Sequence, residues 1–357
     1  MKRRTFVSAA LLASSAWVIP SGCQPSGTSS GSDAGGSDLT SADSADLIAK
    51  AKKAMFCMQR APWEQGIALQ AMVELEDREA VILMAHEAVV RQDAQGRLGF
   101  IGSSNNVTDP VSNGPGVLEA FRFTGEKKYK EAADLQYQYL KEKAPRSPLG
   151  AVYHVDNAPE IWSDSMFMCP IFLAWYGDFE DAMLQVNAYR AMLWNPEIRL
   201  YAHRYDPEHN RWINPKFWGG GNGWSAAAFA ILWEIFPPER GKDRDALAGY
   251  AKELLEGCLA YMRPDGFFHD NINDPESFVE TNLGQMLAYS IFKGVRAGWL
   301  DASYWEQGEK MRHAALSKMD RLGLIRDACG SPYFDRPGTS TEAQAFFIMM
   351  ETARGRG

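Results

Sequence analysis

Residues 161–194 read IWSDSMFMCPIFLAWYGDFEDAMLQVNAYRAMLW. Apolar side chains recur in this stretch with helical spacing over 161–177 and again over 179–194, so that a single residue separates the two segments. Two helices joined by such a short connection pack as an antiparallel hairpin. This stretch therefore predicts one helical hairpin, and the same pattern continues on both sides of it.

Helical periodicity dominates the sequence from residue 45 onward, and strand-type alternation of any length is missing. Several consecutive segments are joined by only a few residues, as in the hairpin above. The predicted helices are 45–59, 63–76, 78–92, 114–124, 127–142, 161–177, 179–194, 222–236, 241–262, 279–298, 301–319 and 339–352. Twelve helices paired in this way make six hairpins.

Five of the longer connections have a similar composition, because each places an aromatic residue beside small or polar residues. They are residues 98–101, 152–155, 200–203, 266–269 and 331–334. They recur about every 50 to 65 residues, which is the length of one hairpin plus a loop and indicates a repeat architecture. We predict an all-α (α/α)₆ barrel, a toroid with an inner and an outer ring of helices. An open solenoid is the alternative, but its repeats are usually more regular. In the toroid these loops crowd one rim, where an aromatic-lined pocket is expected.

Composition and charge restrict the classes of partner. The 357 residues are 46% hydrophobic and 23% charged, which is enough to bury a full core. The net charge of −8 becomes −11 once the first 22 residues, with three basic and no acidic side chains, are removed. Nucleic acid binding depends on Lys and Arg neutralising phosphates, so an acidic protein argues against it. It argues equally against docking on anionic lipid heads.

The N-terminus has the features of an export signal. A basic segment with Arg3, Arg4 and Phe6 precedes an apolar stretch over 9–19, which is too short to span a bilayer. The arginine pair resembles a twin-arginine signal, and the small residues before Cys23 resemble a lipoprotein site. We expect residues 1–22 to be removed.

Lipidation of Cys23 would anchor the chain in the periplasm or cell envelope and would be its only contact with a membrane. Residues 23–44, mostly Ser, Gly and Asp, are predicted to be a flexible tether, followed by a single catalytic domain over 45–357. The remaining cysteines are far apart, which favours free, buried thiols over disulfides or zinc. They are Cys57, Cys169, Cys258 and Cys329.

Asp164 is the first candidate for chemistry. It lies in the first turn of a strongly apolar predicted helix, next to Trp162. A carboxylate there can interact with the helix dipole and the free N–H groups, which is its ordinary role. At the mouth of an apolar, Trp-lined cavity, desolvation would instead raise its pKa and suit it to general acid catalysis.

The segment WGGGNGW at residues 218–224 is the second candidate. It could be a plain loop, and it lacks the pattern of a dinucleotide or phosphate loop. Trp218 and Trp224 on either side of a glycine turn suggest a sugar platform, because glycine lets the backbone approach a ligand closely. Asn222 lies inside the same segment.

Four further residues have both an ordinary and a functional interpretation. His154 and His203 lie on the aromatic loops and are either structural or donors to a polar ligand. Glu280 lies where Thr281 or Asn282 would cap a helix, but it could be a second carboxylate. Trp63, in the segment WEQG at 63–66, could stack on a sugar or pack in the core.

Taken together, WSDSMFM at 162–168 leading to Pro170, and WGGGNGW at 218–224, resemble the unsaturated glucuronyl and rhamnogalacturonyl hydrolases of glycoside hydrolase families 88 and 105. The resemblance extends from about residue 45 to the C-terminus and implies the six-hairpin barrel. It implies hydration of a 4,5-unsaturated uronic acid at the non-reducing end of an acidic oligosaccharide produced by a lyase. No metal or organic cofactor is implied. Asp164 matches the catalytic aspartate of the family, His203 lies near a substrate-contacting histidine, and the two tryptophans match stacking positions.

The sequence departs from the family pattern at two places. Gly220 stands where the family usually has an arginine or another polar residue. Val111 is nearest to the place of a second family aspartate, with Asp109 and Asn113 beside it, and we take Asp109 as the candidate for that carboxylate. An anionic sugar on an acidic protein also needs local cations, and the basic residues nearest the motifs are Arg204, Arg211 and Lys216.

Two other functions fit the same sequence features. A conventional inverting glycosidase would use Asp164 as the acid and a base such as Glu280 or Asp109, with room for a water between the two carboxyl groups. A non-catalytic glycan-binding lipoprotein would keep the tryptophans and tolerate loss of Asp164. The fold alone does not separate these alternatives.

Overall fold

The computed structural model describes residues 41–101 and 105–356. The predicted signal, Cys23 and the tether as far as residue 40 lie outside the described residues, so export and lipidation stay predictions. The first helix begins at Ser41, so the predicted end of the tether at residue 44 is four residues too late.

The described residues contain twelve α-helices, as predicted. They are α1 (Ser41–Phe56), α2 (Pro62–Glu74), α3 (Arg78–Val90), α4 (Gly114–Thr124), α5 (Lys127–Gln138), α6 (Ser165–Tyr176), α7 (Phe179–Leu193), α8 (Gly219–Ile235), α9 (Gly241–Leu259), α10 (Asn282–Ala297), α11 (Trp305–Leu316) and α12 (Thr341–Gly355). In the described part no helix has the length and apolarity needed to cross a membrane.

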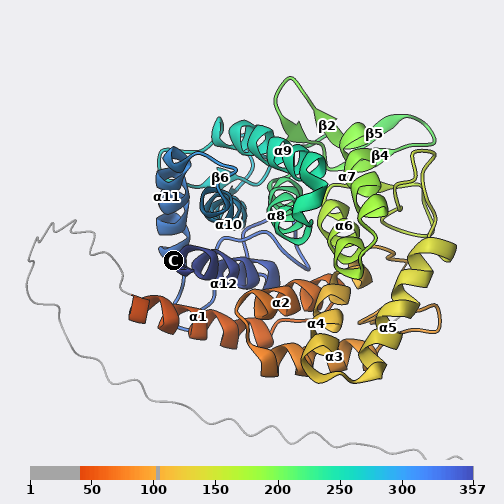
Figure 1. Ribbon diagram of the computed structural model, residues 1–357. Helices are drawn as coiled ribbons and strands as arrows, with labels where there is room; N and C mark the ends of the chain where they lie inside the picture. Colours follow the sequence, from red (N-terminus) through yellow and green to blue (C-terminus); the bar gives the residue numbers. More distant parts are fainter. Residues whose placement is uncertain (1–40, 102–104, 357) are drawn as a thin grey trace, which may run out of the picture. The chain divides into compact units, whose positions relative to one another are not determined.

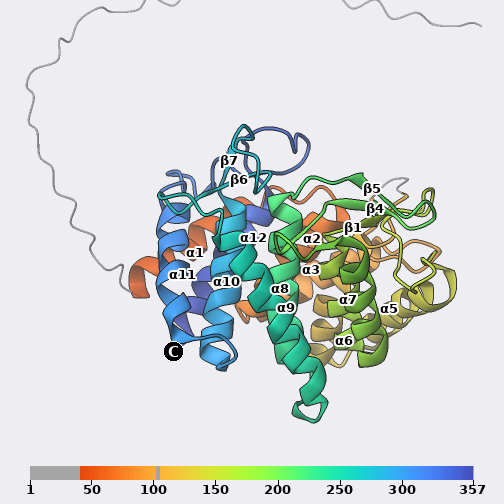
Figure 2. The same cartoon turned by 90° about the horizontal axis from the view of Figure 1, so that it is seen from above.

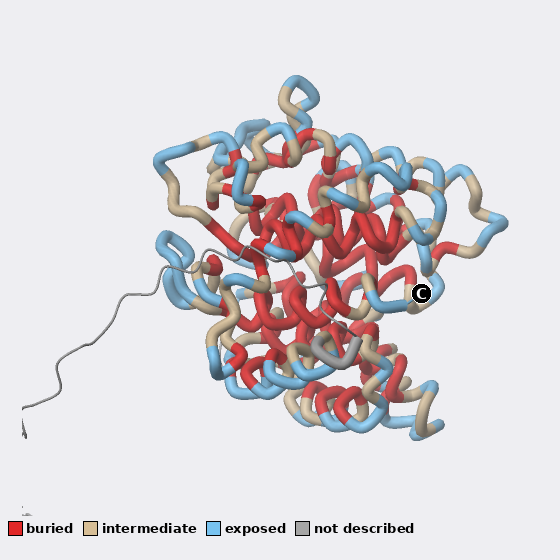
Figure 3. Tube along the Cα trace, turned by 90° about the vertical axis from the view of Figure 1, so that its left-hand side faces the viewer, coloured by how far each residue is buried: buried red, intermediate tan, exposed pale blue. Residues whose placement is uncertain are grey.

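The helices form two concentric rings (Figure 1). The even-numbered helices pack side by side as an inner ring, and each odd-numbered helix lies outside them. Contacts between α12 and α2 close the inner ring, which confirms the (α/α)₆ barrel and excludes the open solenoid. Figure 3 shows the buried chain concentrated in the centre of this barrel.

Most inner helices are more completely buried than the outer helix α5. Nearly every residue of α6, α8, α10 and α12 is buried, whereas α5 buries only one side. A helix that is apolar all round requires neighbours on every side, and the outer ring supplies them. These four almost fully buried helices thus all lie in the inner ring.

Glycines in the inner ring allow close packing of helices. A Cβ atom on Gly116 of α4 would lie 2.2 Å from Leu69 Cγ of α2, well inside van der Waals contact. We expect Gly116→Ala to destabilise the protein by about 1–3 kcal/mol through overpacking. Urea unfolding of the purified variant measures this, with Gly249→Ala in α9, where a Cβ meets nothing within 4 Å, as the control. Equal stability of the two variants would contradict the packing argument.

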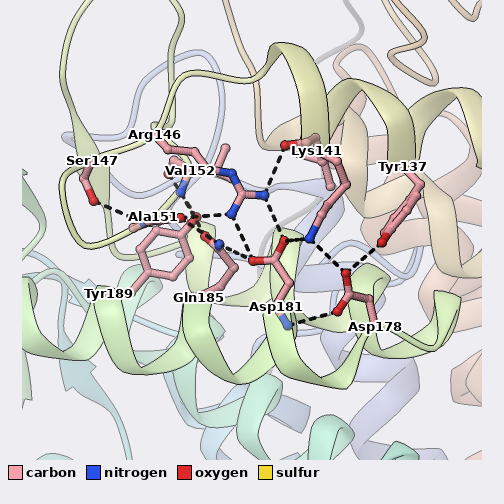
Figure 4. Close-up of polar contacts among 12 residues, drawn as sticks. Tyr137, Lys141, Arg146, Ser147, Ala151, Val152, Asp178, Asp181, Gln185 and Tyr189 are labelled. Carbon is pink, nitrogen blue, oxygen red and sulfur yellow. Dashed lines mark hydrogen bonds and ion pairs between the residues drawn. The ribbon is translucent and has the colours of Figure 1, made fainter.

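An outer ion-pair network joins α5 and the short π-helix η2 (Tyr139–Lys143) to α7 (Figure 4). Asp181 of α7 accepts hydrogen bonds from Arg146 at 2.9 Å and from Lys141 at 2.8 Å. Burial opposes ionisation of Asp181, but these cations outweigh it and lower its pKa to about 2. Asp178 caps α7 by accepting from Asp181 N.

Short antiparallel strands occur where only helix or loop was expected. The strands are β1 (Ile161–Trp162), β2 (Trp194–Asn195), β3 (Leu200–Tyr201), β4 (Arg204–Asp206), β5 (Arg211–Asn214), β6 (Phe268–His269) and β7 (Val279–Glu280). They pair as β1-β4-β5, β2-β3 and β6-β7. Because β1 and β7 occupy the predicted first turns of two helices, α6 and α10 begin four and three residues later than expected.

Two further expectations are corrected. The glycine run at 219–223 is not a turn but the first part of α8, where a Cβ on Gly221 would lie 1.9 Å from Ser163 Oγ. The glycines therefore bring α8 against its neighbours. All four cysteines in the described part are free, but Cys57 is exposed rather than buried.

Candidate active site

One end of the barrel carries a cavity of about 1140 Å³. The connections that lead from outer to inner helices form much of it, and three of the five aromatic loops predicted from the sequence, 152–155, 200–203 and 331–334, contribute lining residues. Figure 2 shows β1, β4, β5, β6 and β7 at this end of the helices. The lining residues are Trp63, Asn106, Asp109, His154, Val155, Trp162, Asp164, Met168, His203, Asn214, Lys216, Trp218, Trp224, Asp270, Asn271, Asp274, Glu276, Ser277, Phe278, Pro332, Tyr333, Phe334, Asp335, Arg336 and Glu342.

The inner helices begin at this cavity. Trp63 lies in the first turn of α2, Asp164 is the N-cap of α6, Trp218 is the N-cap of α8, and Glu342 lies in the first turn of α12. Helix N-termini carry partial positive charge and free N–H groups. Their convergence offsets part of the acidic charge of the protein at the place where an anionic ligand would bind.

Asp164 is positioned by α6 but does not cap it. Its side chain makes no capping hydrogen bond to the helix, and Oδ1 has no hydrogen-bond partner among the described residues. Burial raises the pKa of Asp164 to about 7, against the weaker lowering effects of backbone N–H groups and Arg204. A carboxyl group with this pKa holds a proton near neutral pH and can release it.

Asp109 is the second carboxyl group of the cavity. It begins the 3₁₀ helix η1 (Asp109–Asn113), which leads into α4, and its Oδ2 accepts a 2.6 Å hydrogen bond from Asn106 Nδ2. Burial, followed by the carboxyl groups of Asp164 and Glu342, holds the pKa of Asp109 well above its usual range. Val111 is fully buried in the core, so only Asp109 of these two reaches the cavity.

His154 lies between the two aspartates. Its Nε2 is 3.9 Å from Asp109 Oδ1, and its Nδ1 is 3.7 Å from Asp164 Oδ1, both beyond hydrogen-bonding distance. Burial, with smaller effects of His203 and Arg204, lowers the pKa of His154 to about 3, so the ring is neutral.

The tautomer of His154 follows from its neighbours. Asn106 Nδ2 lies 3.1 Å from Nε2 and donates to it, so the ring proton is on Nδ1. Nδ1 then donates to Thr108 Oγ1 at 2.8 Å, with Ser165 Oγ at 3.0 Å. A neutral, fixed imidazole beside Asp109 and Asp164 adds no positive charge, and both carboxyl groups therefore keep their protons more readily.

Aromatic rings form one wall of the cavity. Trp162 stacks on His154 with ring centres 4.0 Å apart, and the Arg204 guanidinium lies 4.5 Å from the Trp162 ring centre. His203 joins Trp162 to Trp218 through ring contacts at 5.6 Å and 4.8 Å. Half-buried indole and imidazole rings in this arrangement suit a sugar ring with apolar faces and polar edges.

Trp63 and Glu342 form a hydrogen-bonded pair in the lining of the cavity. The Trp63 indole donates a 2.8 Å hydrogen bond to Glu342 Oε1, while Glu342 Oε2 has no partner among the described residues. Burial raises the pKa of Glu342 to about 7. Sequence reasoning missed Glu342, since an acidic residue in a first helical turn is common and gives no sign of a cavity.

Asp270 was also missed. It is 6% exposed and lines the cavity beside Trp218, and its Oδ1 has no hydrogen-bond partner in the described part of the chain. Burial raises its pKa to about 6, which hydrogen bonds from Cys329 and Trp218 partly offset. It directly follows the predicted aromatic loop 266–269, and this position was the signal that could have found it.

Asn222 and Glu280 do not line the cavity, so the expectation that they contact the sugar is not supported. Asn222 accepts from Tyr201 N and donates to Tyr201 O and Trp218 O, which ties β3 to the start of α8. Glu280 accepts from Asn282 N, Leu283 N and Cys329 N. The polar atoms of both side chains are hydrogen-bonded to backbone groups.

Trp224 lines the cavity but lies deep. It is 3% exposed, and its ring meets Phe167 and Phe346 edge to face. Trp224 therefore forms part of the floor, whereas Trp218 offers a more open face.

The sequence profile of Glycosyl Hydrolase Family 88 matches residues 42–352. The chain belongs to this family.

Two curated relatives carry names of activities. An unsaturated rhamnogalacturonyl hydrolase of Bacillus subtilis (strain 168) is 27% identical over 231 residues, or 60% of this chain and 64% of the relative. An unsaturated 3S-rhamnoglycuronyl hydrolase of Formosa agariphila is 25% identical over 193 residues, or 48% and 51%. The chain thus matches about half to two thirds of the length of these relatives.

Solved structures share the fold. A possible member of family GH105 from Salmonella enterica serovar Paratyphi A superposes with a TM-score of 0.78 at 16% identity, covering 90% of this chain and 96% of that one. A glycosyl hydrolase family 88 protein from Bacteroides vulgatus gives a TM-score of 0.72 at 17% identity, covering 88% and 99%.

The three basic residues that the sequence suggested for this family 88 chain differ in how close they lie to the cavity. Arg204 pairs with Glu160 outside the cavity lining, and Arg211 lies near Asp206, away from the cavity. Lys216 does line the cavity and has no ion pair among the described residues. Of the three basic residues proposed from the sequence, Lys216 is the one placed to meet an anionic ligand.

Proposed function

We propose that the chain removes a 4,5-unsaturated uronic acid from the non-reducing end of oligosaccharides by hydration of the double bond. The names of the two curated relatives support a substrate of this class. The observation that carries the proposal is the largely buried Asp164 carboxyl group, whose pKa is raised to about 7, in an aromatic cavity beside Asp109.

The substrate contains an enol ether, because the ring oxygen is attached to C5 of the C4=C5 bond. Protonation of C4 places positive charge on C5 and the ring oxygen. Water then adds to C5 and loses a proton, which gives a hemiketal. The hemiketal opens and releases the neighbouring sugar, so that one water is consumed in total. A single carboxyl group can supply the first proton and accept the second.

Asp164 is the residue that fits this double role. Protonated Asp164 donates to C4, and the carboxylate that remains stabilises the cationic C5 and accepts the proton of the attacking water. Asp109, whose pKa is well above its usual range, stays protonated and can hold the substrate by a hydrogen bond without repelling the Asp164 carboxylate. Trp162, His203 and Trp218 would bind the faces and edges of the ring.

The direct test follows the ultraviolet absorbance of the conjugated double bond. Lyase digests of acidic polysaccharides, rhamnogalacturonan among them, are mixed with purified protein. Loss of absorbance together with release of a saturated sugar is the expected result. Reducing sugar released from saturated glycosides, with unchanged absorbance on every digest, would favour the conventional glycosidase instead.

The pH dependence of catalysis follows from Asp164. Its pKa is raised from 3.8 to about 7, so the required proton is present below pH 7 and lost above it. We expect kcat/KM to be flat on the acidic side and to fall about tenfold per pH unit above pH 7. Initial rates between pH 5 and 9 measure this profile. Activity that rises through pH 7 would contradict the assignment of Asp164 as the acid.

A further inference from the structure

The lining of the cavity contains more acidic than basic residues. Seven of its lining residues are acidic and two are basic. The acidic residues are Asp109, Asp164, Asp270, Asp274, Glu276, Asp335 and Glu342, and the basic ones are Lys216 and Arg336. A site with this balance can accept one anionic group only where a free cation meets it.

Arg336 is already engaged. Its Nε lies 3.0 Å from Asp335 Oδ1, and its guanidinium lies 4.7 Å from the centre of the Tyr333 ring. Lys216 is the lining cation without an ion pair in the described part of the chain. The carboxylate of the unsaturated uronic acid would therefore use Lys216, and no second cation is left for a further anionic substituent.

One buried carboxylate also requires a donor from a ligand. Asp270 is 6% exposed and lines the cavity, and its Oδ1 has no hydrogen-bond partner among the described residues. A sugar hydroxyl can donate to such an oxygen and so satisfy it. A sulfate ester has only acceptor oxygens and an added negative charge, so it would leave Asp270 Oδ1 without a donor and would be repelled by the Asp270 carboxylate.

The sugar next to the uronic acid must lie toward the mouth of the cavity, because an enzyme that acts on a chain end holds that end deepest. The mouth is formed by residues 270–278 and 332–336, where Glu276 and Asp335 are exposed. Tyr333 and Phe334 in the same region are 60% and 43% exposed. Figure 2 shows the β6–β7 region standing out from this end of the barrel. Exposed aromatic rings among acidic groups suit an uncharged sugar face.

We propose that the site takes an unsaturated uronic acid linked to a neutral, hydroxyl-bearing sugar and discriminates against a sulfated one. This specificity rests on the proposed function. The uronate carboxylate is the one anionic group that the site accommodates, and Asp270, Glu276 and Asp335 surround the place of the next sugar.

Matched lyase digests test the proposal. The digests are unsulfated chondroitin against chondroitin sulfate, heparosan against heparin, and rhamnogalacturonan, each followed by loss of ultraviolet absorbance with the full chain. We expect every digest that reacts to be unsulfated, with kcat/KM at least about tenfold above that of its sulfated counterpart. Equal or faster reaction of a sulfated digest would overturn the specificity while leaving the hydration reaction intact. Reaction of no digest would overturn the proposed function itself.

A charge-reversal variant at the mouth of the cavity provides a second test of the proposal. Glu276 is exposed, so Glu276→Lys should fold normally, and it should raise kcat/KM on a sulfated digest about three- to tenfold relative to the unsulfated one. Glu239→Lys changes the net charge equally at an exposed position outside the cavity and should leave that ratio unchanged. A Glu276→Lys protein with the wild-type ratio would show that the mouth does not set the preference.

Discussion

Asp164→Asn should lose activity by about 10²- to 10⁴-fold in kcat while the protein stays folded. An asparagine has the size and shape of the aspartic acid that it replaces, but its amide cannot give a proton to C4. The Asp164 side chain does not cap α6, and Asn is as good an N-cap residue as Asp, so the helix loses nothing. The loss should appear in kcat, with substrate binding largely retained.

The chain offers a matched control one helix later. Asp178 is the N-cap of α7, belongs to the outer network of Figure 4 and does not line the cavity. Asp178→Asn makes the same chemical change at the same helix position, and it should keep wild-type kcat. Single-turnover rates on a reactive digest, with thermal unfolding of both variants, make the comparison. An Asp164→Asn enzyme with more than a tenth of wild-type kcat would rule out Asp164 as the proton donor.

The fold was predictable from the sequence because helical periodicity is a local property. The twelve helices and their pairing could be predicted directly from the sequence. The first residue of a helix could not always be predicted. Ile161 and Val279 continue an apolar pattern into α6 and α10, yet both lie in short strands that form only when β4 and β6 are present. Gly219 begins α8 against its low helix propensity, because close packing decides there.

The candidate site was predictable only in part, for a related reason. Asp164 and Trp218 lie beside distinctive local sequence, and the structure brings both to the cavity. Glu342 and Asp270 come from other hairpins, and ring closure alone places them across the cavity from Asp164. Asn222 and Glu280 looked suitable in sequence because polar residues at helix starts serve either a ligand or the backbone, and here they serve the backbone.

A buried ion pair joins the last two helices of the barrel. Arg312 of α11 and Glu351 of α12 have side chains that are 1% and 0% exposed, with Nε 2.5 Å from Oε1. A second contact joins the Arg312 guanidinium to Oε2 at 3.0 Å, and Ser44 of α1 donates to the same oxygen at 2.6 Å. The pair thus links both ends of the described chain.

Glu351→Ala should lower the free energy of unfolding by about 3–5 kcal/mol, since it leaves the Arg312 guanidinium buried without its main partner. Glu309, whose Oε2 is 3.6 Å from the guanidinium, is already bound by Arg354 at 2.5 Å and compensates only in part. This is a large fraction of the total stability of a domain, about 5–15 kcal/mol. Urea denaturation measures it, and Asp46→Ala, which breaks the exposed Lys50–Asp46 pair of α1, should cost less than about 1 kcal/mol.

The double variant Arg312→Met/Glu351→Leu separates a buried charge from a lost contact. If the cost of Glu351→Ala comes from desolvating an unpaired guanidinium, two apolar side chains of similar volume should recover most of the lost stability. If the cost comes from the specific link between α11 and α12, the double variant should stay as unstable as the single one. Recovery would mean that apolar burial is enough to hold α11 against α12, and that the ion pair fixes which surfaces of the two helices meet.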